Sequence, residues 1–312
     1  MKQKLLFLLL LVCLAVGLFL SVGVTDWGFA LPRRGRKVLT MILVGAAISY
    51  STVLFQTITN NKILTPSIIG FDSLFVLMQT AFVFFFGSLA LMRMDENLLF
   101  LLNAGSMILF AGALYRWLFN REGVHLYFLV LVGVVFGILF GNISNFMQKL
   151  LDPNEFSILQ DSLFASIANA DQELLMISTI LILATAAYSF RFAPYLDVLS
   201  LGRDVAINLG VDHTLVINRL MIVIAIFVSI STALVGPITF FGLLVANLAY
   251  QVMQTHRHSY LVPAAILMSI VALVGGQFML ERVFAFNTTI NVVINFVGGL
   301  YFLYLILMEA RR

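Results

Sequence analysis

Long apolar runs separated by short polar stretches cover almost the whole chain. Each run is about 20 residues long, the length that a helix rising about 1.5 Å per residue needs to cross the hydrocarbon core of a bilayer. Because backbone groups in lipid must be hydrogen-bonded within the segment, we expect each run to be a helix. The ten runs with this pattern are residues 5–24, 38–57, 67–90, 98–118, 124–146, 173–190, 216–235, 238–254, 260–280 and 290–308.

The polar stretches between these runs hold no soluble domain, because the longest of them cover only residues 147–172 and 191–215. The chain is 61% hydrophobic and 11% charged, whereas soluble domains carry about 25% charged residues. So little polar surface could not cover a soluble globule. Pattern and composition together predict an all-α polytopic membrane protein of about ten transmembrane helices, with residues 1–312 forming a single transmembrane domain.

The first apolar run follows Lys2 and Lys4 and resembles a secretory signal peptide. Signal peptides, however, have apolar cores of about 7–15 residues that end at a small-x-small cleavage site. This run is longer and has no such site, so we predict a retained first span. Cys13 is the one cysteine of the chain, which excludes a disulfide framework and a cysteine-based metal site.

The basic residues predict which side of the membrane each loop faces, since cytoplasmic loops are enriched in lysine and arginine. With the N-terminus inside, eleven of the 18 basic residues lie on the cytoplasmic side. The seven outer ones are Arg33, Arg34, Arg36, Lys37, Arg93, Lys149 and Arg282. Both termini are therefore expected in the cytoplasm, and the loop that carries His256 and His258 is expected to face lipid headgroups there.

Four of the seven outer basic residues form one cluster, at residues 33–37. The cluster is a docking patch for acidic residues of an external partner, a site for lipid headgroups, or a sign that the assigned topology is wrong. The planar arginine fork pairs with carboxylates in two-point geometry. This chemistry favours the docking patch.

A polar segment with two Leu-Gly pairs lies between the sixth and seventh apolar runs. It reads LGRDVAINLG over residues 201–210. We predict a short helix, a break at Gly210 and a second helix start near Asp212, a position that suits a helix N-terminus. Apolar side chains of this segment, such as Val205 and Ile207, could enter a groove on a soluble partner.

Pairs of asparagines occupy two of the apolar runs. Asn142 and Asn145 are three residues apart, and Asn291 and Asn295 are four apart, so each pair shares one helix face. An asparagine in lipid needs hydrogen-bond partners, so these faces should point into the bundle. The four residues either line a transport pathway or hydrogen-bond between helices.

Three glycines, Gly133, Gly137 and Gly141, recur every four residues in the fifth run. Small residues at this spacing let helix backbones approach closely in membranes. We therefore predict a packing stripe there rather than a functional site.

Motifs for catalysis and nucleotide binding are absent from the sequence. It has no G-x-x-x-x-G-K-[ST] phosphate loop, no H-E-x-x-H and no G-x-S-x-G. We therefore expect no catalytic residue, no metal, no cofactor and no nucleic-acid partner. Carboxylates within spans often mark ion coupling, and Asp72 is the one nearest to a span interior. A proton-coupled secondary transporter is thus the weaker alternative.

Five segments in order resemble the permease subunits of type II ABC importers for ferric siderophores, haem and cobalamin, the FecCD-like family. The resemblance covers essentially the whole chain. Within it, the sequence looks closest to permeases for ferric catecholate-type siderophores of marine Gram-negative bacteria, with haem or cobalamin as the alternative substrate. The segments are LVGAAISYSTVLFQ (43–56), NKILTPSIIG (61–70), LGRDVAINLG (201–210), GPITFFGLLV (236–245) and TINVVINFVGGLYFLYLIL (289–307).

The resemblance implies an inner-membrane transport subunit that hydrolyses no ATP itself. Two permease subunits, identical or different, would form a central pathway for the ferric siderophore among membrane lipids. Separate ATPase subunits would act on a cytoplasmic coupling segment (197–215), and a periplasmic binding protein would deliver the substrate.

The resemblance also assigns roles to single residues. The residues implied in docking the binding protein are Arg34, Arg36, Lys37 and Arg282. Those implied in ATPase coupling are Leu201, Gly202, Asp204, Ala206, Leu209 and Gly210. Arg36 stands where the family has a proline and Lys37 where it has an arginine, so the docking geometry is expected to differ from that of the family.

Overall fold

The structure is a computed structural model that describes residues 1–24, 26–119, 126–163, 172–282 and 290–309. Each of the ten predicted apolar runs contains an apolar helix, seven of them long enough to cross a membrane and three shorter. Residues 124–125 of the fifth predicted run, and Arg311 and Arg312, lie outside the described residues.

The helices of the described residues are α1 (Lys2–Ser21), α2 (Trp27–Thr59), the 3₁₀ helix η1 (Pro66–Ile69), α3 (Phe71–Phe86), α4 (Ser88–Arg93), α5 (Glu96–Phe119), α6 (Leu126–Gln148), α7 (Pro153–Leu163), α8 (Gln172–Ser189), the 3₁₀ helix η2 (Phe190–Phe192), α9 (Ala193–Leu199), α10 (Arg203–Asn208), α11 (His213–Val235), α12 (Phe241–Met253), α13 (His258–Arg282) and α14 (Ile290–Glu309).

The third predicted span, residues 67–90, is not one helix. It divides into η1, α3 and α4, with breaks at Gly70 and Gly87. Both glycines have positive φ, +96° and +81°, a backbone region that glycine enters at little cost. The hydrophobic pattern does not report these breaks, because all three pieces are apolar.

The second span begins eleven residues earlier than predicted, at Trp27. Asp26 caps it, since its Oδ1 accepts a 2.9 Å hydrogen bond from the Gly28 amide. At about 1.5 Å per residue this helix is longer than the hydrocarbon core of a bilayer. The basic residues 33–37 therefore lie on the first turns of α2 rather than in a loop.

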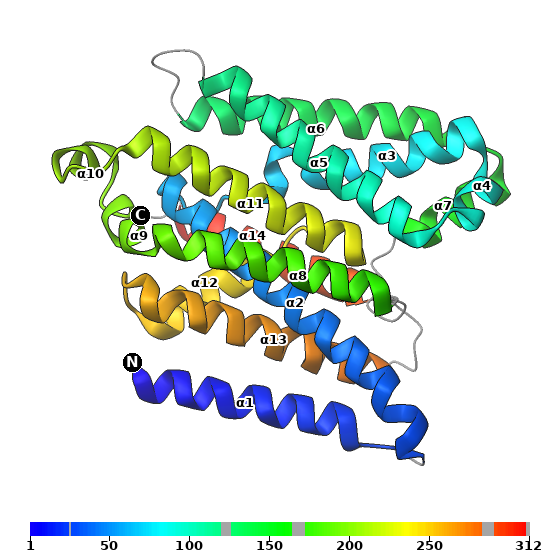
Figure 1. Cartoon of the computed structure of the whole chain (residues 1–312), viewed down its shortest axis with the longest axis horizontal. Coiled ribbons are helices and arrows are strands. Elements are labelled where there is room, and N and C mark those ends of the chain that lie inside the picture. The colour runs from blue at the N-terminus through cyan, green and yellow to red at the C-terminus, as the bar shows by residue number, and fades with distance from the viewer. Residues whose placement is uncertain (25, 120–125, 164–171, 283–289, 310–312) are drawn as a thin grey trace.

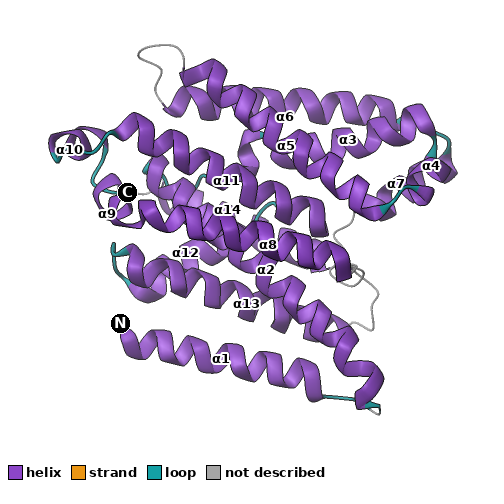
Figure 2. Cartoon of the chain, viewed as in Figure 1, coloured by secondary structure: helices purple, strands orange, loops and turns teal. Residues whose placement is uncertain are grey.

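Two long helices, α2 and α11, pack against each other in the centre of the bundle (Figure 1). In the most apolar stretch of α2, 72% of the residues are buried, whereas in that of α1 only 11% are buried. Helix α1 lies at the edge of the bundle beside α13. At the opposite edge α3 packs against α6. Figure 2 shows helices joined by loops, and no strand occurs among the described residues.

The two ends of the bundle carry different elements. The start of α1 and helices α9 and α10 lie at one end, and α4, α7 and the connection from α1 to α2 lie at the other (Figure 1). This arrangement agrees with the expectation that the N-terminus and the coupling segment face the same side of the membrane.

Candidate functional site

The coupling segment (197–215) forms a projecting turn at one end of the bundle. Helix α10 lies between Gly202, with φ +100°, and Gly210, with φ +81°. At its end the Val211 amide bonds to the Ala206 carbonyl and the Gly210 amide to that of Ile207, the paired bonds of a Schellman cap. A side chain at Gly210 would be strained by this backbone conformation alone.

The second helix start that the sequence predicted is also present. Asp212 is the N-cap of α11, and its Oδ1 accepts a 3.0 Å hydrogen bond from the Leu215 amide. Asp204 lies in the first turn of α10 and is exposed. The two aspartates therefore lie at the starts of the two helices, Asp204 in the first turn of α10 and Asp212 at the N-cap of α11.

Four large apolar side chains on α10 and at its two ends are exposed. They are Leu201 at 60%, Val205 at 43%, Ile207 at 48% and Leu209 at 61%. Ala206 differs from the other coupling candidates, because it is fully buried and faces the permease itself. A direct contact of Ala206 with a partner is therefore excluded, and its small side chain serves the packing beneath α10.

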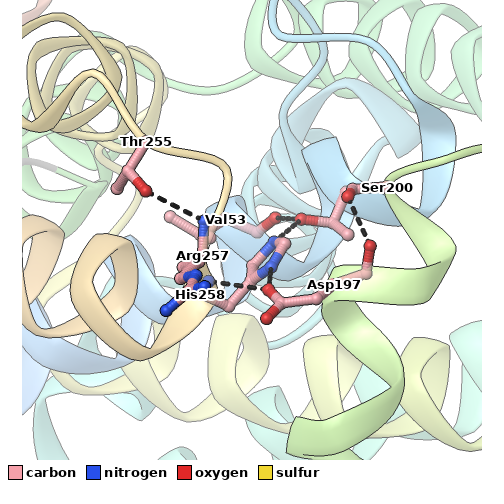
Figure 3. A network of polar contacts seen from close by, with 7 residues as sticks. Val53, Asp197, Ser200, Thr255, Arg257 and His258 are labelled. Carbon is pink, nitrogen blue, oxygen red and sulfur yellow. Dashed lines mark hydrogen bonds and ion pairs between the residues drawn. The ribbon is translucent and has the colours of Figure 1, made fainter.

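The coupling segment is attached to the bundle by a polar network that Figure 3 shows. One oxygen of Asp197, on α9, accepts hydrogen bonds from the backbone amide and the ring Nδ1 of His258, at 2.8 and 2.7 Å. The ring Nε2 lies 2.7 Å from the Thr57 hydroxyl on α2. His258 is 5% exposed, so the expectation that it faces lipid headgroups is wrong.

At the opposite end, two of the docking candidates hold the end of α1. Nη1 of Arg34 donates to the carbonyls of Phe19 and Val22, at 2.9 and 2.8 Å. Nη2 of Arg282 donates to the same Val22 carbonyl at 2.6 Å. Cations suit the last carbonyls of a helix, where the partial charge is negative. These two guanidinium groups therefore hold the end of α1 against α2 and α13.

The third docking candidate, Lys37, forms an ion pair with Glu281 at 2.9 Å, and the two side chains are only 11% and 13% exposed. Glu281 also accepts a hydrogen bond from Gln277. Only Arg36 of the predicted set on α2 is exposed. The sequence did not foresee these internal partners, because Glu281 is 244 positions away from Lys37.

The Lys37→Glu variant is expected to lower the stability of the permease, because it would place two carboxylates against each other. Hydrogen bonds to charged groups contribute about 1.5–3 kcal/mol, so we expect a loss of that order in thermal unfolding in detergent. The swap Lys37→Glu/Glu281→Lys should restore most of it. Arg36→Glu is the matched control, and an equal loss in this variant would contradict the assignment.

The asparagine pair on α6 does not point into the bundle. Asn142 and Asn145 are both exposed on the single chain, beside exposed Leu139 and Phe146. The prediction that this face packs within the subunit is therefore wrong. A face with two amides among large apolar groups remains suited to a second subunit or to a pathway between subunits.

The pair on α14 is described in part. The side chain of Asn291 lies outside the described part of the structure. Asn295 is half-buried, and its Oδ1 has no hydrogen-bond partner. A buried amide oxygen without a partner is costly in a membrane, so this position suits a contact that a second subunit or a substrate supplies.

A continuous row of contacts joins α6 to α14. Gly137 of α6 meets Gly70, and Asp72 accepts a 2.8 Å hydrogen bond from Thr239. The next residue, Phe240, packs against Gly298 of α14. Helix α6 therefore contacts the interruption between α2 and α3, residues 60–70, and α14 contacts the interruption between α11 and α12, residues 236–240. Within the described ranges, no group of three metal-ligating side chains gathers.

Comparison with known proteins gives relatives over the full length of the chain. It is 52% identical to the petrobactin import system permease protein YclO of Bacillus subtilis, over 100% of this chain and 98% of the relative. It is 38% identical to the petrobactin import system permease protein FatC of Bacillus anthracis, over 97% and 88%. Both are Bacillus proteins, so they do not favour the branch from marine Gram-negative bacteria.

The fold is that of a known ABC permease. A solved structure described as an inward-facing conformation of a putative metal-chelate type ABC transporter matches with a TM-score of 0.83. The match covers 98% of each chain at 22% identity, which establishes the architecture. The model of the FecCD transport family matches residues 5–308. The chain is therefore a multi-pass membrane protein of the FecCD transport family, a permease subunit of an ABC importer and not an enzyme.

Proposed function

We propose that this permease carries a ferric siderophore of the catecholate type across the cytoplasmic membrane, with petrobactin as the substrate to test first. The observation that carries the proposal is the 52% identity to a petrobactin permease along the whole chain. Affinity for the siderophore would reside in a separate binding protein.

The coupling segment would engage a separate ATPase subunit in the cytoplasm. Its exposed leucines and isoleucine at the tip of the bundle are suited to an apolar groove. ATP-driven closure of two ATPase subunits would move two such segments and switch the permease between outward and inward access. Both termini would then lie in the cytoplasm, at the same end as the coupling segment.

A second permease subunit, identical or homologous, would cover α6 and α14. Both helices carry rows of exposed apolar side chains and an asparagine pair. Asn142, Asn145, Asn291 and Asn295 are the proposed pathway residues. Facing asparagines from two subunits would give the pathway polar groups that bind a siderophore only weakly.

The binding protein would dock at the opposite end. Arg36 is the proposed contact on α2, and Arg282, which is exposed and holds Val22 with one nitrogen, is the proposed contact on α13. Arg34 and Lys37 would contribute indirectly, because their internal bonds fix the backbone that presents Arg36.

Uptake of radioactive iron in cells that lack this chain tests the proposal. Cells would receive iron as ferric petrobactin, as a ferric hydroxamate or as haem, with labelled cobalamin as a fourth arm. We expect loss of ferric petrobactin uptake alone and restoration by the wild-type gene. Unchanged petrobactin uptake with loss of another substrate would reject the catecholate assignment.

Complementation with Arg36→Glu tests the docking site in the same cells. Reversal of a charge in a protein interface slows association and costs about tenfold or more when the partner is a carboxylate. We expect lower uptake at normal permease levels, corrected by a higher concentration of binding protein. Wild-type uptake by this variant would reject Arg36 as a docking contact.

A further inference from the structure

The Asp197–His258–Thr57 network joins three elements that are far apart in the sequence. Asp197 belongs to α9 and His258 is the first residue of α13 (Figure 3). Thr57 lies in the last turn of α2. The bonds to His258 span 61 and 201 positions. One buried imidazole ring is therefore the point where the coupling segment, α13 and α2 meet.

The two bonds to Asp197 have a defined direction. A carboxylate accepts only, so the Nδ1 of His258 carries the hydrogen that Asp197 receives at 2.7 Å. The same carboxylate oxygen accepts from the His258 amide and so caps the first turn of α13 from another helix. Nε2 meets the Thr57 hydroxyl, which is also bonded to the Val53 carbonyl at 2.8 Å.

The attachment of α10 directs any force through α9 and α11. Helix α10 packs mainly against these two neighbours. On the α9 side, Leu196 and Leu199 are 2% exposed and bury the helix against the bundle. Apolar contacts of this kind resist separation but allow sliding, since they are non-directional. The bonds of Asp197 are directional and fix the position of α9 relative to α13.

We propose that Asp197 and His258 form a joint that transmits displacement of the coupling segment to the start of α13 and the end of α2. The inference rests on the proposed function, because it assumes that an ATPase moves the coupling segment. Both side chains are positioning residues that act through the helices they connect. Without the joint, α10 would still bind the ATPase, but its movement would be lost in sliding of α9.

Three variants test separately the bonds between Asp197 and His258 and the bond between His258 and Thr57. Asp197→Ala removes the acceptor of both bonds, whereas Asp197→Asn keeps one oxygen that can accept them. His258→Asn places an amide where Nδ1 stands and retains the link to Asp197, but it is too short to reach Thr57. The importer would be assembled in liposomes with its ATPase and binding protein, and ferric petrobactin taken up would be measured per ATP hydrolysed.

We expect Asp197→Ala to assemble normally, hydrolyse ATP and transport at least about fivefold less siderophore per ATP, the lower end of typical allosteric coupling. Asp197→Asn should recover most of that ratio, and His258→Asn should lie between. A wild-type ratio in Asp197→Ala overturns the joint. So does a fall in transport that only matches a fall in the amount of assembled complex.

A distance measurement tests the joint independently of the substrate. Spin labels at Asn208→Cys and Ser259→Cys, both exposed positions, would report α10 against α13 in a Cys13→Ser background, since Cys13 is exposed as well. On ATP binding we expect one fixed distance with the joint intact and a changed, broadened one in Asp197→Ala. An identical response in both overturns the inference. A wild-type importer that takes up no siderophore refutes the proposed function instead.

Discussion

Replacing Leu201 and Leu209 with glutamate is expected to abolish uptake while leaving the permease folded in the membrane. Both side chains are about 60% exposed, so their removal costs little within the subunit. Burial of a leucine in a partner contributes about 1.5–3 kcal/mol. Two lost leucines therefore weaken ATPase binding by roughly 3–6 kcal/mol, which is more than about a hundredfold in the dissociation constant.

Co-purification of the ATPase subunit with the tagged permease measures this effect, with uptake recorded in the same cells. Asn208→Glu is the matched control, because it adds a charge to the same exposed helix without removing an apolar contact. Normal co-purification of the double variant would show that the ATPase binds another surface of the permease. Loss of the permease from the membrane would show that the leucines are structural.

The spans were predictable because their chemistry is repetitive. A helix in lipid must be apolar over about 20 residues, so the runs reported the positions of the helices within a few residues, except at the start of α2. Breaks inside apolar sequence were not predictable from that pattern. Gly70 and Gly87 interrupt the third run by backbone conformation alone, and α2 begins before its apolar run and includes the basic residues 33–37.

The candidate sites divide in a similar way. The coupling segment is local, and its two Leu-Gly pairs predicted both ends of α10. Arg34, Lys37 and His258 depend on partners that folding brings from other helices, which sequence spacing does not reveal. One signal was available in the sequence. Lys37 and Glu281, the acidic neighbour of Arg282, could have been paired by their opposite charges. The outward direction of Asn142 and Asn145 required the packing of α6 itself.

The double variant Gly133→Ala/Gly137→Ala is expected to leave little folded permease in the membrane. A methyl group at Gly133 would lie 2.5 Å from Cγ2 and 2.9 Å from Cα of Ile69. One at Gly137 would lie 3.1 Å from Cα of Gly70. Since both clashes involve backbone atoms, of Ile69 and of Gly70, a side-chain rotation cannot relieve them. Overpacking of this kind costs about 1–3 kcal/mol per site.

Gly141→Ala provides the internal control, because the same stripe has nothing within 4 Å of a methyl group at that position. Alanine there should be neutral or stabilising by up to about 1 kcal/mol, since it is the better helix former. The measurement is the thermal unfolding midpoint of each variant in detergent, together with its level in the membrane. Equal midpoints for the double variant and Gly141→Ala would mean that α6 does not lie at backbone distance from η1. The predicted contrast places the close contact at two of the three glycines, Gly133 and Gly137, and leaves Gly141 free of it.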